Sequence, residues 1–154
     1  MTTTRNPTPI KRYVVARSED LPAGSRLITD ISGRSIGVFN VDGRYYALRN
    51  SCPHQGAALC SGPILGTLSS PSPGEFVYDA ERKLVICPWH NWEFELATGQ
   101  SWFDPVRTRV RPYEVAVETG RALTEPDAEG RLPGPYVAET LEVELDGEYV
   151  VVRL

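Results

Sequence analysis

The chain contains few of the side chains that bind metals or carry redox chemistry. Its 154 residues include two histidines, three cysteines and one methionine. No G-x-G-x-x-G motif, the fingerprint of dinucleotide-binding folds, follows any predicted strand. We therefore expect nicotinamide and flavin chemistry to belong to another polypeptide.

Long apolar runs and runs of basic residues are also absent. No stretch approaches the roughly 20 apolar residues that a membrane-spanning helix needs, and residues 1–12 lack the apolar segment of a secretory signal. The chain has 16 basic and 20 acidic side chains, a formal net charge of −4. A mildly acidic chain without a basic patch is a poor ligand for nucleic acid. We expect a cytoplasmic protein that binds neither nucleic acid nor membranes.

Glycine and proline are abundant, with 13 of each, and the hydrophobic runs between them are short. This composition predicts an all-β chain with many turns. Asp42-Gly43 is a strong signal for a two-residue hairpin turn, and Ser32-Gly33 is a second expected turn. The expected strands are residues 13–16, 26–31, 35–41, 45–49, 76–78, 83–86, 92–96, 107–117, 141–145 and 149–152.

Two short segments each combine one cysteine with one histidine. The first reads Cys-Pro-His-Gln-Gly from Cys52, so that His54 follows at a C-x-H spacing. The second reads Cys-Pro-Trp-His-Asn-Trp from Cys87, so that His90 follows at a C-x-x-H spacing. Together they use both histidines and two of the three cysteines of the chain, which argues against a chance arrangement.

Two metal centres use this ligand set. Two cysteines and two histidines can bind a structural zinc ion, but zinc sites usually place cysteine near cysteine and histidine near histidine. Here each segment mixes the two ligand types. That arrangement favours a binuclear iron–sulfur cluster, in which one iron takes both cysteines and the other takes both histidines.

With these two segments, the chain resembles the Rieske [2Fe–2S] protein family from about Tyr13 to the C-terminus. It is most similar to the soluble ferredoxin-type members, the ferredoxin components of ring-hydroxylating oxygenase systems. The resemblance implies a Rieske-like antiparallel sandwich: a basal sheet domain with an inserted cluster-binding subdomain at about residues 50–105. It implies a flexible segment at residues 1–12 followed by one domain at residues 13–154.

The resemblance also implies a role for each ligand of the [2Fe–2S] cluster. Cys52 and Cys87 would hold one iron as thiolates. His54 and His90 would hold the other iron, the one that is reduced, through one ring nitrogen each. The other ring nitrogens would face solvent and form the surface where redox partners dock.

The expected function is one-electron transfer from a flavin-dependent reductase to an oxygenase or a similar terminal enzyme. The alternative is a small or regulatory subunit of a larger oxidoreductase, such as a nitrite-reductase-like complex. Rieske oxygenases activate oxygen at a separate iron held by two further histidines and a carboxylate. Because both histidines are already assigned, we expect an electron carrier without enzymatic activity or a small-molecule substrate of its own.

The residues around the ligands predict a low reduction potential. Quinol-oxidising members of the family carry an extra cysteine in each ligand loop, where this chain has Ala57 and Trp89. They also place a serine where this chain has Trp92. Fewer hydrogen bonds to sulfur stabilise the reduced state less. We expect a midpoint toward the bottom of the roughly −150 to +300 mV Rieske range.

The resemblance to Rieske ferredoxins does not explain two insertions and a group of arginines. Residues 61–74 and 122–135 are insertions rich in loop-forming residues. For residues 61–74 we favour a passive surface loop over a lid or docking element. Arginines 107, 109 and 111 are expected on one face of a strand, where a solvated face is favoured over a docking patch.

Two further side chains have expected roles. Trp89 lies between Cys87 and His90 and is expected to pack over the cluster. Cys60 is expected to be a small buried hydrophobe rather than a reactive thiol.

Overall fold

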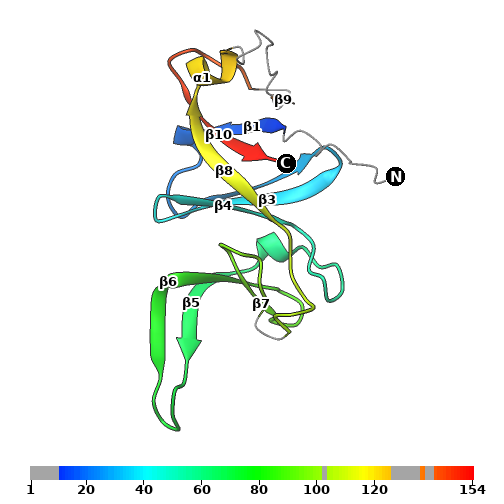
Figure 1. Ribbon diagram of the computed structural model, residues 1–154, viewed down its shortest axis with the longest axis vertical. Helices are drawn as coiled ribbons and strands as arrows, with labels where there is room; N and C mark the ends of the chain where they lie inside the picture. The colour runs from blue at the N-terminus through cyan, green and yellow to red at the C-terminus, as the bar shows by residue number, and fades with distance from the viewer. Residues whose placement is uncertain (1–10, 102–103, 126–135, 138–140) are drawn as a thin grey trace, which may run out of the picture. The chain divides into compact units, whose positions relative to one another are not determined.

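The computed structural model describes residues 11–101, 104–125, 136–137 and 141–154. The chain forms two compact units: a central unit of residues 21–115, and a terminal unit of residues 1–20 and 116–154. Antiparallel β-sheets dominate both (Figure 1), and the prediction of an all-β fold is confirmed. The expected cluster-binding subdomain, residues 50–105, falls inside the central unit, and its exact limits stay a prediction.

The first sheet of the central unit is a meander of β2 (Arg26–Ile31), β3 (Arg34–Val41) and β4 (Arg44–Arg49), with the start of β8 (Pro112–Thr119) beside β4. These strands match the predicted ones to within one residue at each end, except at β8. Both predicted turns have two residues with positive φ, 53° and 78° at Ser32-Gly33 and 53° and 89° at Asp42-Gly43. Such turns match the twist of the strands that they join.

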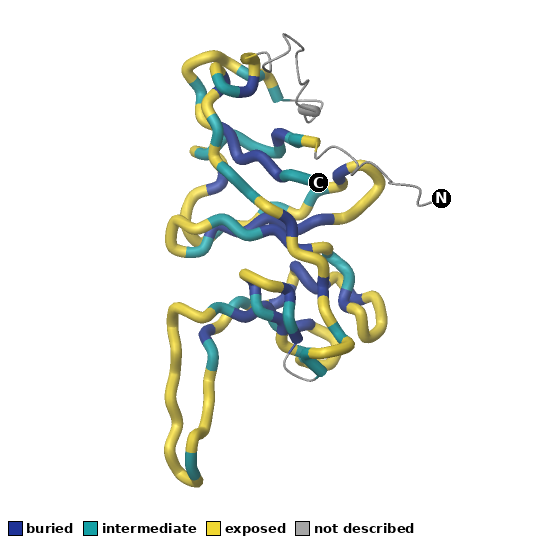
Figure 2. The backbone as a smooth tube through the Cα atoms, viewed as in Figure 1, coloured by how far each residue is buried: buried dark blue, intermediate teal, exposed yellow. Residues whose placement is uncertain are grey.

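The second sheet corrects the prediction for residues 61–74. Six of these residues form strand β5 (Ile64–Ser69), which pairs with β6 (Val77–Ile86), and β7 (Glu93–Glu95) completes the sheet. The separate strands expected at residues 76–78 and 83–86 are one continuous strand. The outer part of the β5–β6 hairpin extends beyond β7 (Figure 1) and is mostly exposed (Figure 2).

Contacts within the outer hairpin explain why β5 forms despite its weak sequence signal. The Gly66 N–H donates to the Tyr78 hydroxyl at 3.1 Å, and a Cβ at Gly66 would collide with that ring. Leu68 lies opposite Tyr78 in the register. The aromatic ring thus covers the glycine and pairs with the leucine, a cross-strand contact that stabilises a sheet.

The core of the central unit contains both predicted cysteine ligands. It consists of Phe39, Leu48, Cys52, Ala57, Leu59, Cys60, Val85, Cys87, Phe94, Leu96 and Val110. Burying each large side chain of this kind contributes about 1.5–3 kcal/mol. The ligand loops are therefore anchored at their first residue in the hydrophobic core of the unit.

The 3₁₀ helix η2 (Leu59–Ser61) follows the first ligand loop and is held tightly in place. Arg26 donates hydrogen bonds from Nη1 to the carbonyl oxygens of Cys60 and Gly62. A Cβ at Gly37 would overlap the Cys60 side chain, so only glycine lets β3 approach this helix so closely.

The predicted strand at residues 107–117 is wrong in its first half. Strand β8 begins only at Pro112. Residues 105–107 form a turn, and residues 108–111 belong to no strand, with one isolated bridge between Gln100 and Arg109. Asp104 closes the turn, because its carboxylate accepts from Arg107 N–H and its carbonyl accepts from Thr108 N–H. The three arginines therefore do not form one face of a strand.

The terminal unit contains β1 (Arg12–Arg17), the 3₁₀ helix η1 (Ser18–Asp20), the end of β8, α1 (Gly120–Thr124), β9 (Tyr136–Val137) and β10 (Glu148–Arg153). β1 is antiparallel to β10 and parallel to β9. Helix α1 replaces the start of the predicted insertion at residues 122–135, of which residues 126–135 lie outside the described residues. The strand expected at residues 141–145 does not form.

A small core holds the terminal unit together. It consists of Val14, Leu123, Tyr149 and Val151. The Tyr149 hydroxyl accepts from the Glu144 N–H at 2.6 Å and donates to the Glu142 carbonyl at 3.2 Å, which ties the segment before β10 to this core. Helices capable of crossing a membrane are not found among the described residues.

Candidate metal centre

The first ligand loop is a tight turn that begins at the buried Cys52. The Cys52 N–H donates to the Ala57 carbonyl at 2.9 Å, and the Gly56 N–H donates to the Cys52 carbonyl at 2.7 Å. Gly56 has a φ of 78°. A Cβ there would meet nothing within 4 Å, so glycine is favoured by backbone conformation and not by crowding.

The second ligand loop repeats this backbone pattern from Cys87. The Cys87 N–H donates to the Trp92 carbonyl at 2.8 Å, and the Asn91 N–H donates to the Cys87 carbonyl at 2.9 Å. Asn91 has a φ of 59°, a region that asparagine tolerates better than most residues do. Cys52 and Cys87, Gly56 and Asn91, and Ala57 and Trp92 thus occupy equivalent positions in the two loops.

The structure brings the four predicted ligands together as two pairs. Cys52 and Cys87 are almost completely buried, with 2% and 1% of their surface exposed. His54 and His90 are exposed, and their rings meet edge to face with centroids 4.8 Å apart. The thiols therefore lie on the core side of the loops and the imidazoles on the solvent side.

Burial and the second thiol control the protonation of Cys52. Burial raises the pKa of the Cys52 thiol, and the neighbouring Cys87 raises it further. The backbone N–H groups of His54 and Gln55 act in the opposite direction, because they donate to the sulfur. If a metal ion replaced the proton, the Cys52 thiolate would still accept these amide hydrogen bonds.

The donor set fits a binuclear cluster with unlike irons. Among the described residues, no three His, Cys, Asp or Glu side chains converge on one point as a mononuclear site requires. A Rieske cluster requires two separate pairs instead, two thiolates on one iron and two imidazoles on the other. The buried thiol pair and the adjacent imidazole pair meet that requirement.

Trp92, which lies at the start of the strand expected at residues 92–96, contacts one of these ligands. The Trp92 ring stacks on the His54 ring with centroids 4.1 Å apart and an interplanar angle of 12°. Trp89, which was expected to cover the cluster, has 60% of its surface exposed. The indole that lies against a predicted ligand is therefore Trp92 and not Trp89. The sequence feature that could have identified Trp92 is its position: it lies five residues after Cys87, and Ala57 lies at the same distance from Cys52 in the other loop.

Cys60 is not part of the ligand set. It is fully buried, its Sγ lies 3.5 Å from the Leu48 carbonyl oxygen, and burial raises the pKa of its thiol to about 12. The expectation that Cys60 behaves as a buried hydrophobe is confirmed.

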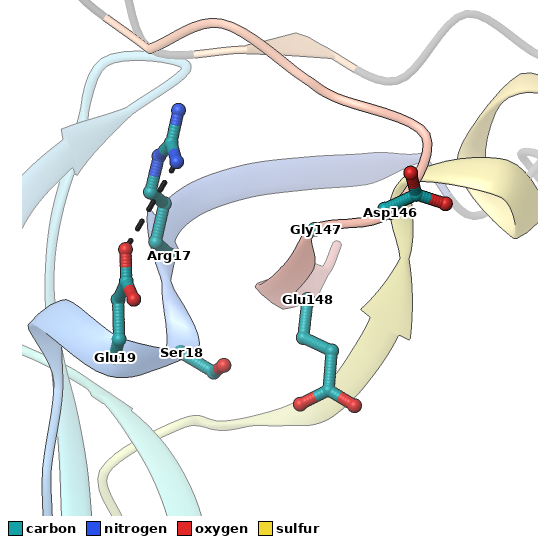
Figure 3. A pocket seen from close by; sticks show the side chains of 6 residues that line it. All are labelled: Arg17, Ser18, Glu19, Asp146, Gly147 and Glu148. Atoms are coloured by element: carbon teal, nitrogen blue, oxygen red, sulfur yellow. Dashed lines mark ion pairs between the residues drawn. The ribbon is translucent and has the colours of Figure 1, made fainter.

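A second cavity among the described residues offers no competing redox site. A polar cavity of about 350 Å³ in the terminal unit is lined by Arg17, Ser18, Glu19, Asp146, Gly147 and Glu148 (Figure 3). Arg17 and Glu19 form an ion pair across 3.9 Å. The lining includes no histidine or cysteine.

Residues 11–114 match the family model of the Rieske [2Fe–2S] domain. Among characterised relatives, the ferredoxin component of the naphthalene 1,2-dioxygenase/salicylate 5-hydroxylase systems of Ralstonia sp. is 25% identical over 105 residues, which cover 68% of this chain and 86% of the relative. Among solved structures, the ferredoxin of carbazole 1,9a-dioxygenase from Nocardioides aromaticivorans IC177 is 28% identical, with a TM-score of 0.54, covering 70% of this chain and 90% of the ferredoxin.

A second solved structure covers more of the chain at lower identity. It is a protein from Mycobacterium tuberculosis described as an NADH-dependent nitrite reductase small subunit, with a TM-score of 0.57 and 18% identity, covering 96% of this chain and 97% of the other. At this identity the likeness concerns the fold alone.

Proposed function

The chain belongs to the Rieske [2Fe–2S] domain family, and we propose that it is a one-electron carrier that accepts electrons from a flavin-dependent reductase and delivers them to an oxygenase or a similar terminal enzyme. The observation that carries this proposal is the arrangement of the ligand loops, with two thiols buried and two imidazoles exposed. The similarity to ferredoxin components of dioxygenase systems supports the choice of partners.

In this proposal each ligand has one task. Cys52 and Cys87 bind one iron as thiolates, and His54 and His90 bind the other through one ring nitrogen each. The bound cluster supplies reversible one-electron reduction at a potential above that of clusters with four cysteine ligands. The chain contributes the rest: its core keeps water from the thiolates, and its exposed imidazoles bring the other end of the cluster to the surface.

The chain is proposed to be a carrier and not an oxygenase because it has no histidine to spare. A mononuclear iron for oxygen activation needs two histidines and a carboxylate in addition to the Rieske ligands. The whole sequence contains two histidines, and both lie in the ligand loops. Substrate oxidation would therefore take place on the partner.

The first experiment tests for the cluster. The purified chain, prepared without oxygen, should contain about two iron atoms and two acid-labile sulfides per molecule, the composition of a [2Fe–2S] centre. After reduction with dithionite it should give the EPR spectrum of a cluster with mixed thiolate and imidazole ligands. A colourless protein that contains zinc would refute the proposal.

The second experiment tests for transfer. NADH together with a catalytic amount of a flavin-dependent ferredoxin reductase should reduce the chain, and the bleaching of the visible bands of the chain follows the reaction. Without an added oxygenase, the mixture should not hydroxylate an aromatic substrate. Hydroxylation by the chain and the reductase alone would contradict the role of a carrier.

A second candidate is a permanent small subunit of a larger oxidoreductase, such as a nitrite-reductase-like complex. The M. tuberculosis protein described as such a subunit shares the fold over 96% of the chain, which makes this candidate worth testing. A permanent subunit should be poorly soluble or inactive by itself, whereas a separate carrier should be soluble and reducible by a generic ferredoxin reductase. Size-exclusion chromatography of the isolated chain, followed by the reduction assay, separates the two.

We place the carrier in the cytoplasm. All three thiols are free of disulfides, the state that the reducing cytoplasm maintains. Fractionation of cells that produce the chain checks this location, and recovery in a membrane or periplasmic fraction would contradict it.

A further inference from the structure

Trp92 connects the two ligand loops. Its backbone carbonyl accepts the Cys87 N–H at 2.8 Å, which places it in the second loop. Its ring stacks on His54, which belongs to the first loop, with centroids 4.1 Å apart and an angle of 12° between the planes. One residue therefore contacts the backbone of one loop and the ligand side chain of the other.

The Trp92 ring is itself held in place. The residue is partly buried and packs against the core of the central unit that includes Phe39, Phe94 and both ligand cysteines. The next residue, Glu93, starts strand β7, and its pairing with Ile86 of β6 fixes the backbone on that side. A ring anchored in this way is a rigid surface against which an exposed imidazole can be oriented.

The orientation of His54 has few other determinants in its own loop. His54 and its neighbours Pro53, Gln55 and Gly56 are exposed, so no core packing restricts the imidazole on the solvent side. Ala57, which is equivalent to Trp92 by loop position, has no ring that could stack on His90. His54 and His90 contact one another only edge to face, at 77°. Among the contacts of the described residues, the Trp92 ring is the one that covers a face of the His54 ring and so restricts its rotation.

We infer that Trp92 is a positioning residue for the electron-transfer site: by stacking on His54, it fixes the plane of the imidazole that binds iron. This inference rests on the proposed function, because it assigns His54 to the outer iron. Groups that orient metal-bound histidines typically change metal affinity or activity by 10- to 100-fold when they are removed. The orientation of the ring also sets how the imidazole donates to the metal, which the spectrum of the reduced cluster reports.

The test compares three substitutions of Trp92 with a matched control. Trp92→Phe keeps an aromatic face, Trp92→Leu keeps a large apolar side chain in the core without a face, and Trp92→Ala removes both. The control is Trp89→Ala, which removes a tryptophan three residues away that is exposed. For each variant, the measurements are the g-values of the dithionite-reduced cluster and the rate at which a chelator removes iron.

Trp92→Leu and Trp92→Ala should shift and broaden the g-values and lose iron about 10-fold faster than the wild type. Trp92→Phe should restore most of the wild-type spectrum, and Trp89→Ala should leave both measurements unchanged. If Trp92→Ala does not fold, Trp92→Leu decides, because it fills the core. Wild-type g-values and iron loss in Trp92→Leu would overturn the inference while leaving the proposed function intact. A wild-type chain without a [2Fe–2S] cluster would overturn both.

Discussion

The two ligand loops have the same backbone and different side chains. Both close with the same pair of hydrogen bonds and both place a residue with positive φ at the fifth position. The histidine is the third residue of one loop, His54, and the fourth residue of the other, His90. The sixth residue is the small Ala57 in the first loop and the large Trp92 in the second. The matching backbones thus place Cys52 and Cys87 at equivalent positions, whereas the other side chains make the two ligand loops different.

The largest expected effect is loss of the cluster when the equivalence of the thiols is broken. Cys52→Ser and Cys87→Ser should each abolish the visible absorption bands, because each thiolate is one of only two on its iron. His54→Ala and His90→Ala should also remove or strongly destabilise the cluster. Iron and sulfide analysis with visible spectroscopy measures this, and Cys60→Ser is the matched control, which should keep a wild-type spectrum. Retention of a wild-type cluster in either cysteine variant would contradict the ligand assignment.

The second prediction concerns the reduction potential, which depends on the sixth loop positions. Ala57 and Trp92 have no hydroxyl or thiol to donate to a sulfur atom, and the disulfide of quinol-oxidising members cannot form, because Ala57 and Trp89 stand where it needs two cysteines. We expect a midpoint toward the bottom of the roughly −150 to +300 mV range of Rieske centres. A potentiometric titration followed by visible or EPR spectroscopy measures it. A midpoint near the top of the range would show that other hydrogen bonds compensate.

The third prediction compares the fifth positions, Gly56 and Asn91. Gly56→Ala forces a β-carbon into a left-handed backbone and should destabilise the fold by about 1 kcal/mol, roughly 2–4 °C in Tm for a chain of this size. Asn91→Gly relaxes the same conformation and should change stability by less than about 0.5 kcal/mol. Thermal unfolding without oxygen measures both. Equal destabilisation by the two substitutions would contradict the equivalence of the loops.

The last prediction concerns Cys60, the cysteine outside the loops. Burial raises the pKa of its thiol from 9.0 to about 12, so the folded state holds this proton more tightly than the unfolded state does. The protonated Cys60 thiol contributes fully to stability below pH 9, and this contribution is lost as the pH rises from 9 toward 12. By pH 10 the loss should be about 1.4 kcal/mol. The difference in unfolding free energy between pH 8 and pH 10 should be smaller in Cys60→Ala than in the wild type. An unchanged difference would show that the Cys60 thiol does not cause this loss of stability.

The sequence predicted what local chemistry determines. Asp42-Gly43 and Ser32-Gly33 indicate their turns because the glycine of each, and Asp42, tolerate positive φ, and the strands around them match the prediction to within a residue. The candidate ligands were identified in the same way, because C-x-H and C-x-x-H are local spacings. The structure then placed these four side chains in two adjacent pairs.

The sequence did not predict what depends on partners distant in the chain. Strand β5 forms because Tyr78 covers Gly66 and lies opposite Leu68, a contact that no local pattern in residues 61–74 reveals. The stacking of Trp92 on His54 joins loops more than 30 residues apart. Residues 107–111 alternate like a strand, but Asp104 holds Arg107 and Thr108 in a turn, and residues 109–111 join no strand.

The separation of buried thiols from exposed imidazoles has a kinetic consequence. If only the imidazole edge is within tunnelling distance of the surface, the electron donor and the electron acceptor must use the same small area. They therefore compete for the carrier, and no complex of all three proteins transfers electrons. Each turnover then requires the carrier to dissociate from one partner before it meets the other, so turnover should slow when either partner is added in large excess.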